Sequence, residues 1–250
     1  MRFDVITLFP NLFTIPLTQG VTRRAFDEGR VQVRTWPLRD FGEGPHRRVD
    51  DRPYGGGPGM VMLYEPLERA LTAIRAERGE EQRVPLVHFT PTGDRIDQRI
   101  VDDFAAGPGA VLLCGRYEGI DQRFIDRYVD RELSLGDFVL SGGELPALAL
   151  LDAVARLQEG VLGDPDSHRQ DSFSDGLLEG PHFSRPETLP GDAGAVPDVL
   201  MSGHHGAIAR WRRERALELT ARRRPDLIDA ARAAGRLDER DERFLASRLL

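Results

Sequence analysis

The chain has 250 residues, of which 40% are hydrophobic and 30% charged; this predicts one or two folded domains and excludes a disordered chain. Its single cysteine, Cys114, excludes an internal disulfide framework and a cysteine-rich zinc site, and it fits a reducing cytoplasm, where we expect the protein. The net charge of −7 excludes a uniformly basic nucleic-acid coat, but residues 206–250 hold 12 Arg against 8 Asp and Glu, so this basic segment can bind a polyanion locally.

The first part of the chain alternates strand-like and helix-like patterns, which is typical of an α/β domain with a mostly parallel sheet. Asp4 interrupts the first apolar run and no small-residue cleavage site is present, so this run predicts a strand rather than a signal peptide. In chain order we expect a strand at 3–8, a loose helix at 11–28, a strand at 31–36, a loop at 37–60, a helix at 64–78, a strand at 84–89, a turn at 90–94, a helix at 96–105 and a strand at 110–114.

Residues 144–158 are expected to form the most apolar helix of the chain, with Pro146 in its first turn. Its apolar residues spread around much of the helix, so we expect burial on several sides. The longest nearly unbroken apolar run lies within it and is far shorter than the roughly 18 residues of a membrane helix, so no membrane partner is expected. Residues 159–203, rich in Gly, Pro, Ser and Asp, predict a linker and an irregular segment; a helix then runs from His205 to a stop at Pro225, and two short helices follow.

Three glycine-bearing segments follow expected strands, at the end where parallel α/β sheets bind ligands. Glycines there let backbone N–H and C=O groups approach a ligand such as an adenine edge, and an apolar side chain such as Leu140 can flank its ring. The alternative is three ordinary tight turns, but three in one domain favour a shared ligand site. The segments are residues 90–93, 115–119 and 135–143.

Two common nucleotide-binding motifs are absent. No G-x-G-x-x-G follows a strand, which excludes the usual dinucleotide fingerprint. A P-loop is excluded too, because its G-x-x-x-x-G-K-[ST] pattern needs a lysine and all 34 basic residues are arginine. The GGGPG run at 55–59 has the wrong spacing for either motif, and a substrate-side loop explains it as well as direct ligand contact does.

Five motifs then occur in one order at close spacing. They are RDF at 39–41, HRRVDDRPYGGGPGM at 46–60, CGRYEGID at 114–121, SLGDFVLSGGELPAL at 134–148, and a DSF–GLL–PHF–RP series between Asp171 and Pro186. Together they resemble the bacterial tRNA (guanine-N1)-methyltransferase family, which modifies the guanine at tRNA position 37. The resemblance runs from residue 1 to about residue 224, and the last 25 residues match weakly.

The resemblance implies a SPOUT-type parallel sheet with a deep C-terminal trefoil knot that binds S-adenosylmethionine, which periodicity alone would not have shown. It implies a knotted cofactor-binding domain at 1–162, a flexible linker at 163–175 and a small helical tRNA-binding domain at 176–250. It also implies an obligate homodimer with its sites at the interface, which suits the very apolar helix at 144–158. The implied cofactor-binding residues are Phe89, Thr90, Pro91, Gly115, Tyr117, Glu118, Gly119, Leu135, Gly136, Asp137, Phe138, Val139, Leu140, Gly142, Gly143 and Pro146.

Methyl transfer to guanine N1 needs a base to remove the N1 proton, and a cation or donor near O6, where negative charge develops. The resemblance assigns the base to Asp171 and the charge at O6 to Arg156. From the residues alone, a helix or turn cap explains Asp171, and an i,i+4 ion pair with Asp152 explains Arg156. Glu118 matches a carboxylate beside the cofactor, and the family's magnesium dependence makes it a weak candidate for Mg²⁺.

The expected tRNA contacts lie in the C-terminal part, where arginines around Trp211 on a basic helix are suited to phosphates of the anticodon stem-loop. The alternative is a solvated helix face with a core tryptophan. The family commonly has Ser-Gly-Asn-His before this helix; His204 replaces the Asn here, which could change a cap or a local RNA contact. The candidate tRNA-binding residues are His182, Arg185, His205, Arg210, Arg212 and Arg213.

Two other functions stay open at this stage. A SPOUT ribose 2′-O-methyltransferase would share the knot but needs no base for guanine N1, so Asp171 argues against it. A catalytically silent RNA-binding protein would keep the fold alone, and the presence of Asp171, Arg156 and all three glycine-bearing segments argues against it.

Overall fold

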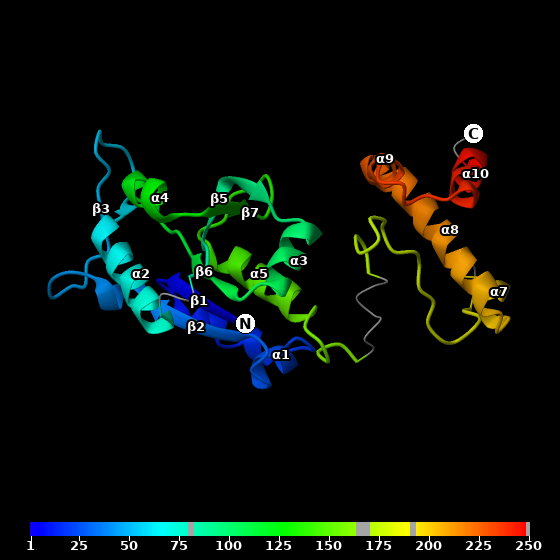
Figure 1. Cartoon of the computed structure of the whole chain (residues 1–250), viewed down its shortest axis with the longest axis horizontal. Helices are drawn as coiled ribbons and strands as arrows, with labels where there is room; N and C mark the ends of the chain where they lie inside the picture. Colours follow the sequence, from blue (N-terminus) through cyan, green and yellow to red (C-terminus); the bar gives the residue numbers. More distant parts are fainter. Residues whose placement is uncertain (80–82, 164–170, 191–193, 249–250) are drawn as a thin grey trace. The chain divides into compact units, whose positions relative to one another are not determined.

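The computed structural model describes residues 1–79, 83–163, 171–190 and 194–248. It divides into two compact units, Met1–Pro165 and Asp166–Leu250, and each unit is considered by itself (Figure 1). Most of the predicted linker at 163–175 lies outside the described residues. Of the helices that the structure describes, none combines the length and the apolar character that crossing a membrane requires.

A parallel five-stranded sheet organises the first unit, and it confirms the α/β class expected from the alternating pattern. The strand order is β2-β1-β6-β5-β7, so β5 lies between two strands that follow it in the chain. The central strand β6 is buried along its whole length, as expected for a parallel sheet covered on both faces. The strands are β1 (Arg2–Thr7), β2 (Gln32–Pro37), β5 (Leu86–Arg95), β6 (Gly109–Leu113) and β7 (Arg131–Ser134).

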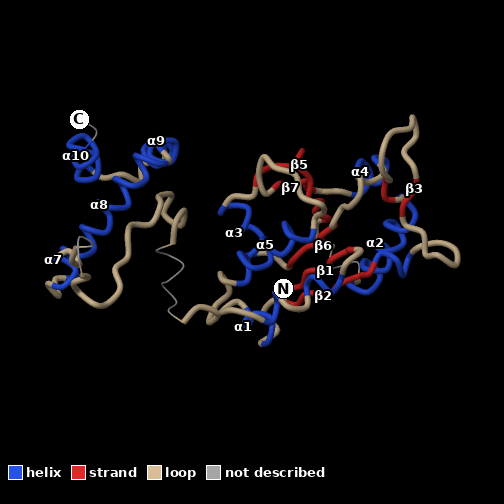
Figure 2. The backbone as a smooth tube through the Cα atoms, turned by 180° about the vertical axis from the view of Figure 1, so that it is seen from behind, coloured by secondary structure: helices blue, strands red, loops and turns tan. Residues whose placement is uncertain are grey.

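Helices cover both faces of the sheet, and two separate apolar clusters result (Figures 1 and 2). Alternate residues of β6 belong to the two different clusters, because successive side chains of a strand point to opposite faces of the sheet. Leu112 packs with α3 and α5, whereas Leu113 packs with α2 and α4. The helices are α2 (Tyr64–Arg78), α3 (Gln98–Ala106), α4 (Gln122–Tyr128) and α5 (Glu144–Ala155).

Local capping explains where several of these helices begin and end. Asp97 starts α3 by accepting a hydrogen bond from the Ile100 N–H at 3.0 Å, and this bond lowers the pKa of the Asp97 carboxyl. The Asp121 side chain caps α4 in the same way, accepting the Arg123 N–H at 3.0 Å. Gly79, with φ of 82°, ends α2 in the left-handed region that favours glycine.

Two expectations for the first unit were wrong. Instead of one helix at 11–28, the chain forms the 3₁₀ turns η1 (Pro10–Phe13) and η2 (Pro16–Thr18) and the short helix α1 (Arg23–Asp27). A proline occupies the first position of each 3₁₀ turn, and proline is tolerated at the start of a helix but not in its interior, so a single helix cannot continue through this segment. Instead of a turn at 90–94, the strand β5 continues to Arg95, with an irregularity between Phe89 and Asp94 where it pairs with β7. The strand β7 and the helix α4 were not expected from the sequence.

The expected loop at 37–60 also contains regular structure. It begins with the 3₁₀ turn η3 (Leu38–Phe41). Asp50 and Asp51 form the short strand β3 (Asp50–Asp51), which pairs antiparallel with β4 (Val61–Met62). The residues between these two strands form the loop that carries the GGGPG run.

Asp4, the charged residue within the first apolar run, is completely buried in β1. Its carboxylate accepts hydrogen bonds from Arg2 Nη2 at 2.7 Å, Trp36 Nε1 at 2.8 Å and Arg78 Nε at 2.6 Å. A buried charge is tolerated only when it is paired and hydrogen-bonded. The carboxylate therefore joins β1 to β2 and α2.

The second unit is a small group of helices, which agrees with the helical pattern expected after His205. The helix α8 ends just before Pro225, as predicted, and Pro225 then becomes the first residue of α9. Leu177, from the irregular segment before the helices, packs into the core with Leu217, Ile228 and Leu245. The helices are α7 (Asp198–Met201), α8 (His205–Arg223), α9 (Pro225–Ala233) and α10 (Glu239–Arg248).

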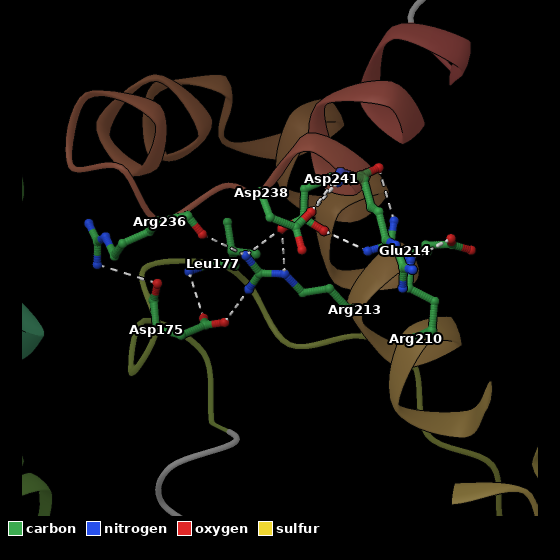
Figure 3. Close-up of polar contacts among 9 residues, drawn as sticks. Asp175, Leu177, Arg210, Arg213, Glu214, Arg236, Asp238 and Asp241 are labelled. Atoms are coloured by element: carbon green, nitrogen blue, oxygen red, sulfur yellow. Dashed lines mark hydrogen bonds and ion pairs between the residues drawn. The ribbon is translucent and has the colours of Figure 1, made fainter. Parts of the chain in front are cut away.

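A buried carboxylate also joins the elements of this unit (Figure 3). Asp241 of α10 accepts hydrogen bonds from Arg210 Nη1 at 2.8 Å and from Arg213 Nη2 at 3.0 Å, both on α8. Arg213 Nη1 also donates to Asp175 at 2.6 Å, which ties the irregular segment to α8. Two arginines of the basic helix thus stabilise the unit that carries them.

Candidate active site

The three glycine-bearing segments meet at one edge of the sheet. In the order β6-β5-β7 the middle strand carries residues 90–93, and the segments 115–119 and 135–143 follow its two neighbours. Together they enclose a cleft of about 290 Å³, near the lower limit of small-molecule sites, to which the first segment contributes Thr90 and Pro91. Its Gly93 packs instead against the backbone of Glu132 and Leu133. The strand order, which local patterns do not contain, is what brings the three segments together.

The residues expected to bind the cofactor line this cleft, apart from Gly136 and Asp137. Asp137 is largely exposed and pairs with Arg95. Gly136 takes part in the turn itself, where its N–H donates to Ser134 Oγ at 3.2 Å. The cleft also includes three residues outside the expected segments, namely His88, Leu133 and Ser134, while Arg116 and Ser141 line it as members of the segments 115–119 and 135–143.

The last of the three segments is packed closely against the end of β6. The Gly143 N–H donates to the Gly115 carbonyl at 3.0 Å. A Cβ on Gly143 would lie 2.8 Å from Cys114 Cα, so no larger residue fits without moving the backbone. The two glycines therefore form a backbone cradle, a part of the cleft lining that has no side chains and through which the third segment packs against β6.

Arg116 and Glu144 fasten the rim of the cleft. Glu144 is almost completely buried at the start of α5 and accepts hydrogen bonds from Thr7 Oγ1 at 2.8 Å and Arg116 Nε at 2.9 Å. Arg116 Nη1 also donates to the Ser141 carbonyl at 3.1 Å, and the guanidinium lies 4.4 Å from the centre of the Phe9 ring. The Arg116–Glu144 ion pair, with its further hydrogen bonds, thus connects the end of β1 to the segments that follow β6 and β7.

Replacing Gly143 by Ala is expected to weaken binding of S-adenosylmethionine, the cofactor implied by the resemblance, by roughly 10-fold or more. The new methyl group would meet backbone atoms, and relieving such a clash costs about 1–3 kcal/mol. Isothermal titration calorimetry measures the effect. Gly163→Ala is the matched control, because a Cβ there meets no atom within 4 Å. Equal affinity of both variants and the wild type would contradict the cradle.

Tyr117 and Glu118 form the side of the cleft nearest to β3 and β4. Tyr117 has φ of 60°, an uncommon conformation for a residue with a side chain and one that often marks a functional position. Partial burial and the nearby charge of Asp50 raise the pKa of its phenol. Within the described ranges no three His, Cys, Asp or Glu side chains are grouped to hold a metal ion, so binding of Mg²⁺ by Glu118 stays a prediction.

His88 is one of the residues that line the cleft. Its Nδ1 lies 3.2 Å from Glu132 Oε1 on β7, while its Nε2 lies 3.1 Å from the point that a Cβ on Gly115 would occupy. Burial lowers the pKa of His88, although Glu132 partly opposes this effect. The ring is therefore neutral near pH 7.

Cys114 adjoins the same cradle without acting as a nucleophile. The side chain is fully buried, and burial together with the charge of Glu144 raises the pKa of its thiol well above the usual range. A protonated, inaccessible thiol is unreactive. Cys114 is thus a small core residue of the first unit.

Comparison with known proteins identifies the family. The model of the tRNA (Guanine-1)-methyltransferase TrmD family matches residues 1–230. The chain belongs to this family. It is 70% identical to the tRNA (guanine-N(1)-)-methyltransferase of Leptothrix cholodnii, an alignment that covers 99% of each chain. The proteins of that name from Methylibium petroleiphilum and Paracidovorax citrulli are 68% and 65% identical, and each alignment covers at least 98% of both chains.

The two residues that the resemblance assigns to catalysis, Arg156 and Asp171, lie in different units. Arg156 directly follows α5 in the first unit and is partly buried. Asp171 begins a tight turn of the second unit, in which its carbonyl accepts the Ser174 N–H at 3.2 Å and the Phe173 N–H donates to Leu177 at 2.7 Å. Their catalytic roles stay predictions.

The tRNA-binding candidates differ in how much of their side chain is engaged within the second unit. Arg210 and Arg213 pair with Asp241, whereas Arg212 of the same helix is exposed. His182 is also exposed, with its Nε2 2.7 Å from Glu179 Oε1. Arg185 and His205 are exposed as well.

His204, the departure from the usual family pattern, has a local role. Its Nδ1 accepts the Ala207 N–H at 3.0 Å and so caps α8. This is the task that asparagine commonly performs at a helix start. The substitution therefore keeps the cap at the beginning of the basic helix.

Proposed function

We propose that this protein transfers a methyl group from S-adenosylmethionine to N1 of the guanine at position 37 of tRNA, 3′ to the anticodon. The observation that carries the proposal is the meeting of three glycine-bearing family segments in one cleft whose base is main-chain atoms. Bound S-adenosylmethionine supplies an electrophilic methyl group on a sulfonium centre. Gly115 and Gly143 line the cleft without side chains, and neutral His88 adds no opposing charge.

Asp171 and Arg156 are the proposed catalytic pair. Guanine N1 carries a proton and is a poor nucleophile, so the Asp171 carboxylate removes this proton while negative charge grows on O6. The Arg156 guanidinium stabilises the charge at O6. The turn from Asp171 to Ser174 gives the carboxylate a defined local backbone, which supports a positioned base.

We propose that the anticodon stem-loop of tRNA is bound by the second unit. Arg212, His182 and Arg185 present exposed polar side chains suited to phosphates and to the edges of unpaired bases. Arg210 and Arg213 hold α8 against α10 through Asp241, and contacts of these two arginines with phosphates would be additional to this structural role. His205 lies at the start of α8, where N–H groups favour an anion.

A second copy of the chain is proposed as the protein partner. Leu12 and Ile15 near η1 and Leu145 on α5 are exposed apolar side chains, with Ile15 70% exposed, and η1 packs against α5. A partner subunit that covered them would remove this apolar surface from water. The trefoil knot that the resemblance implies is likewise proposed.

Two further assignments complete the proposal. We place the reaction in the cytoplasm, because tRNA is its proposed substrate. Mg²⁺ is assigned to Glu118 only as a contact shared with waters or substrate oxygens, since magnesium commonly keeps several waters.

The experiment that tests the function is labelled methyl transfer to tRNA transcripts with guanine or adenine at position 37. Transfer to N1 of guanine, and none to adenine, is the expected result, read by nucleoside mass spectrometry. A ribose 2′-O-methyltransferase would leave the base unmodified and label the sugar of either transcript. A silent RNA-binding protein would label neither transcript while still binding both.

A further inference from the structure

The loop between β3 and β4 carries the most exposed aromatic side chain among the described residues. Tyr54 has 101% of its reference surface exposed. Residues 52–60 extend away from the sheet and helices of the first unit in both views (Figures 1 and 2). A tyrosine ring stabilises a fold when it is buried, so the folding of this unit gives no reason for an aromatic residue here.

The C-terminal end of this loop is fixed to the cleft. The Glu118 N–H donates to the Met60 carbonyl, and the Met62 N–H donates to the Gly119 carbonyl, each at 2.9 Å. Gly59 has φ of 78°, and a Cβ there would lie 2.4 Å from Glu118 Cγ. The loop therefore leaves directly from the lip of the candidate cofactor cleft.

The N-terminal end is held beside the same lip. Asp50 pairs with Met62 in the β3–β4 ladder, and its charge acts on the phenol of Tyr117, a cleft-lining residue. The Arg52 N–H then donates to Asp51 Oδ1 at 2.8 Å. Both ends of the loop are thus anchored beside the cleft, and Tyr54 lies in the loop between these two ends.

The tip has the chemistry of a nucleobase platform. Gly55, Gly56 and Gly57 follow the ring; all three have positive φ, and a Cβ on any of them would meet no atom within 4 Å. Nothing at the tip therefore blocks access to the ring face. Arg52, two residues before Tyr54 in the chain, is exposed, and Arg123 of α4 lies within electrostatic range of Tyr54, so the surroundings also favour a phosphate backbone.

The proposed reaction creates a use for such a ring. To place N1 beside a methyl donor inside a cleft, the target guanine must leave its stack, and this leaves one face of each neighbouring base without a partner. Aromatic side chains restore that stacking in many single-stranded RNA complexes, with little dependence on base identity.

Resting on the proposed function, we propose that Tyr54 stacks on a nucleobase directly flanking the target guanine and so holds the opened RNA at the cleft. The hydroxyl is dispensable and the ring is not. Tyr54 thereby favours RNA whose target guanine has left its stack, and it takes no part in binding the cofactor.

Three substitutions of Tyr54 test this in the full-length protein. Tyr54→Ala is expected to lower kcat/KM for tRNA by roughly 10- to 100-fold, the loss typical for one stacked base, with the Kd for S-adenosylmethionine unchanged. Tyr54→Phe keeps the ring and should remain within about 2-fold of the wild type. Tyr54→Leu keeps apolar bulk without the ring and should resemble Tyr54→Ala.

A binding measurement without turnover isolates the stacking. Anticodon stem-loops with 2-aminopurine at position 36 or 38 should lose fluorescence on binding the wild type at one of the two positions. Tyr54→Phe should retain that quenching and Tyr54→Ala should lose it. This titration also separates the two proposals, because failure of methyl transfer in the wild type would reject the function while the quenching still reports on the platform.

Three results would overturn the inference. Wild-type kcat/KM and quenching in Tyr54→Ala would show that the ring contacts no base. Weaker cofactor binding in Tyr54→Ala would show that it supports the cleft instead. A change in oligomeric state of Tyr54→Ala, measured by analytical ultracentrifugation, would show that the ring contacts a second copy of the chain.

Discussion

Asp171→Asn is expected to lower the rate of methyl transfer to guanine 37 by about 10²–10⁴-fold while leaving the Kd for S-adenosylmethionine unchanged. The amide has the shape of the carboxylate but cannot accept the N1 proton, so the loss corresponds to removal of a general base. Single-turnover kinetics with saturating cofactor measures the rate of the chemical step. Raising the pH should partly restore the variant, because hydroxide then removes the N1 proton from guanine in place of the side chain.

Two observations distinguish this role from a structural one. Asp198→Asn, which replaces an exposed carboxylate in the same unit, is the control and should retain the wild-type rate. A structural role for Asp171 would instead lower the unfolding temperature of the second unit, or weaken cofactor or tRNA binding, with no recovery at high pH. That pattern would remove Asp171 from the mechanism.

Asp4→Ala is expected to destabilise the first unit by about 3–5 kcal/mol, the usual loss when one partner of a buried ion pair is removed. Arg78, whose side chain is almost completely buried, would keep its charge without its carboxylate, and Trp36 would lose the acceptor for its indole N–H. For a unit of this size, the loss corresponds to a decrease in Tm of about 6–20 °C.

The measurement can be confined to the unit concerned. The chain has two tryptophans, and a Trp211→Phe background leaves Trp36 to report on the first unit by fluorescence during thermal unfolding. The control is Asp27→Ala, which breaks an i,i+4 pair with Arg23 whose side chains are 59% and 56% exposed. That change should amount to less than about 1 kcal/mol, because exposed pairs contribute little. Equal effects of the two substitutions would contradict the structural role of the Asp4 network.

Several elements follow from patterns confined to a few residues. The helix expected at 64–78 is α2 (Tyr64–Arg78), and the expected start of α8 at His205 and its stop before Pro225 are both confirmed. Apolar spacing, proline geometry and capping act over one or two turns, so a short window of sequence contains them. The buried strands β1 and β6 were found for the same reason.

The elements that were missed depend on partners elsewhere in the chain. The strand β7 has only four residues, two of them Arg131 and Glu132, and it is a strand because it pairs with β5. The same pairing extends β5 through the expected turn at 90–94. A short polar run has no periodicity to detect, so tertiary contacts decide its conformation.

For the candidate site, the amino-acid sequence by itself indicated the glycine-bearing segments, and the family resemblance within it singled out Asp171 and Arg156, whose catalytic roles stay predictions. Only the tertiary structure decided that β6 and β7 flank β5, that His88 belongs to the cleft, and that Arg210 and Arg213 bind Asp241 within their own unit. The physical reason is the separation along the chain over which each property is decided. Side-chain type and backbone preference are local properties, whereas the order of strands and the partner of a charge depend on residues brought together only when the chain folds.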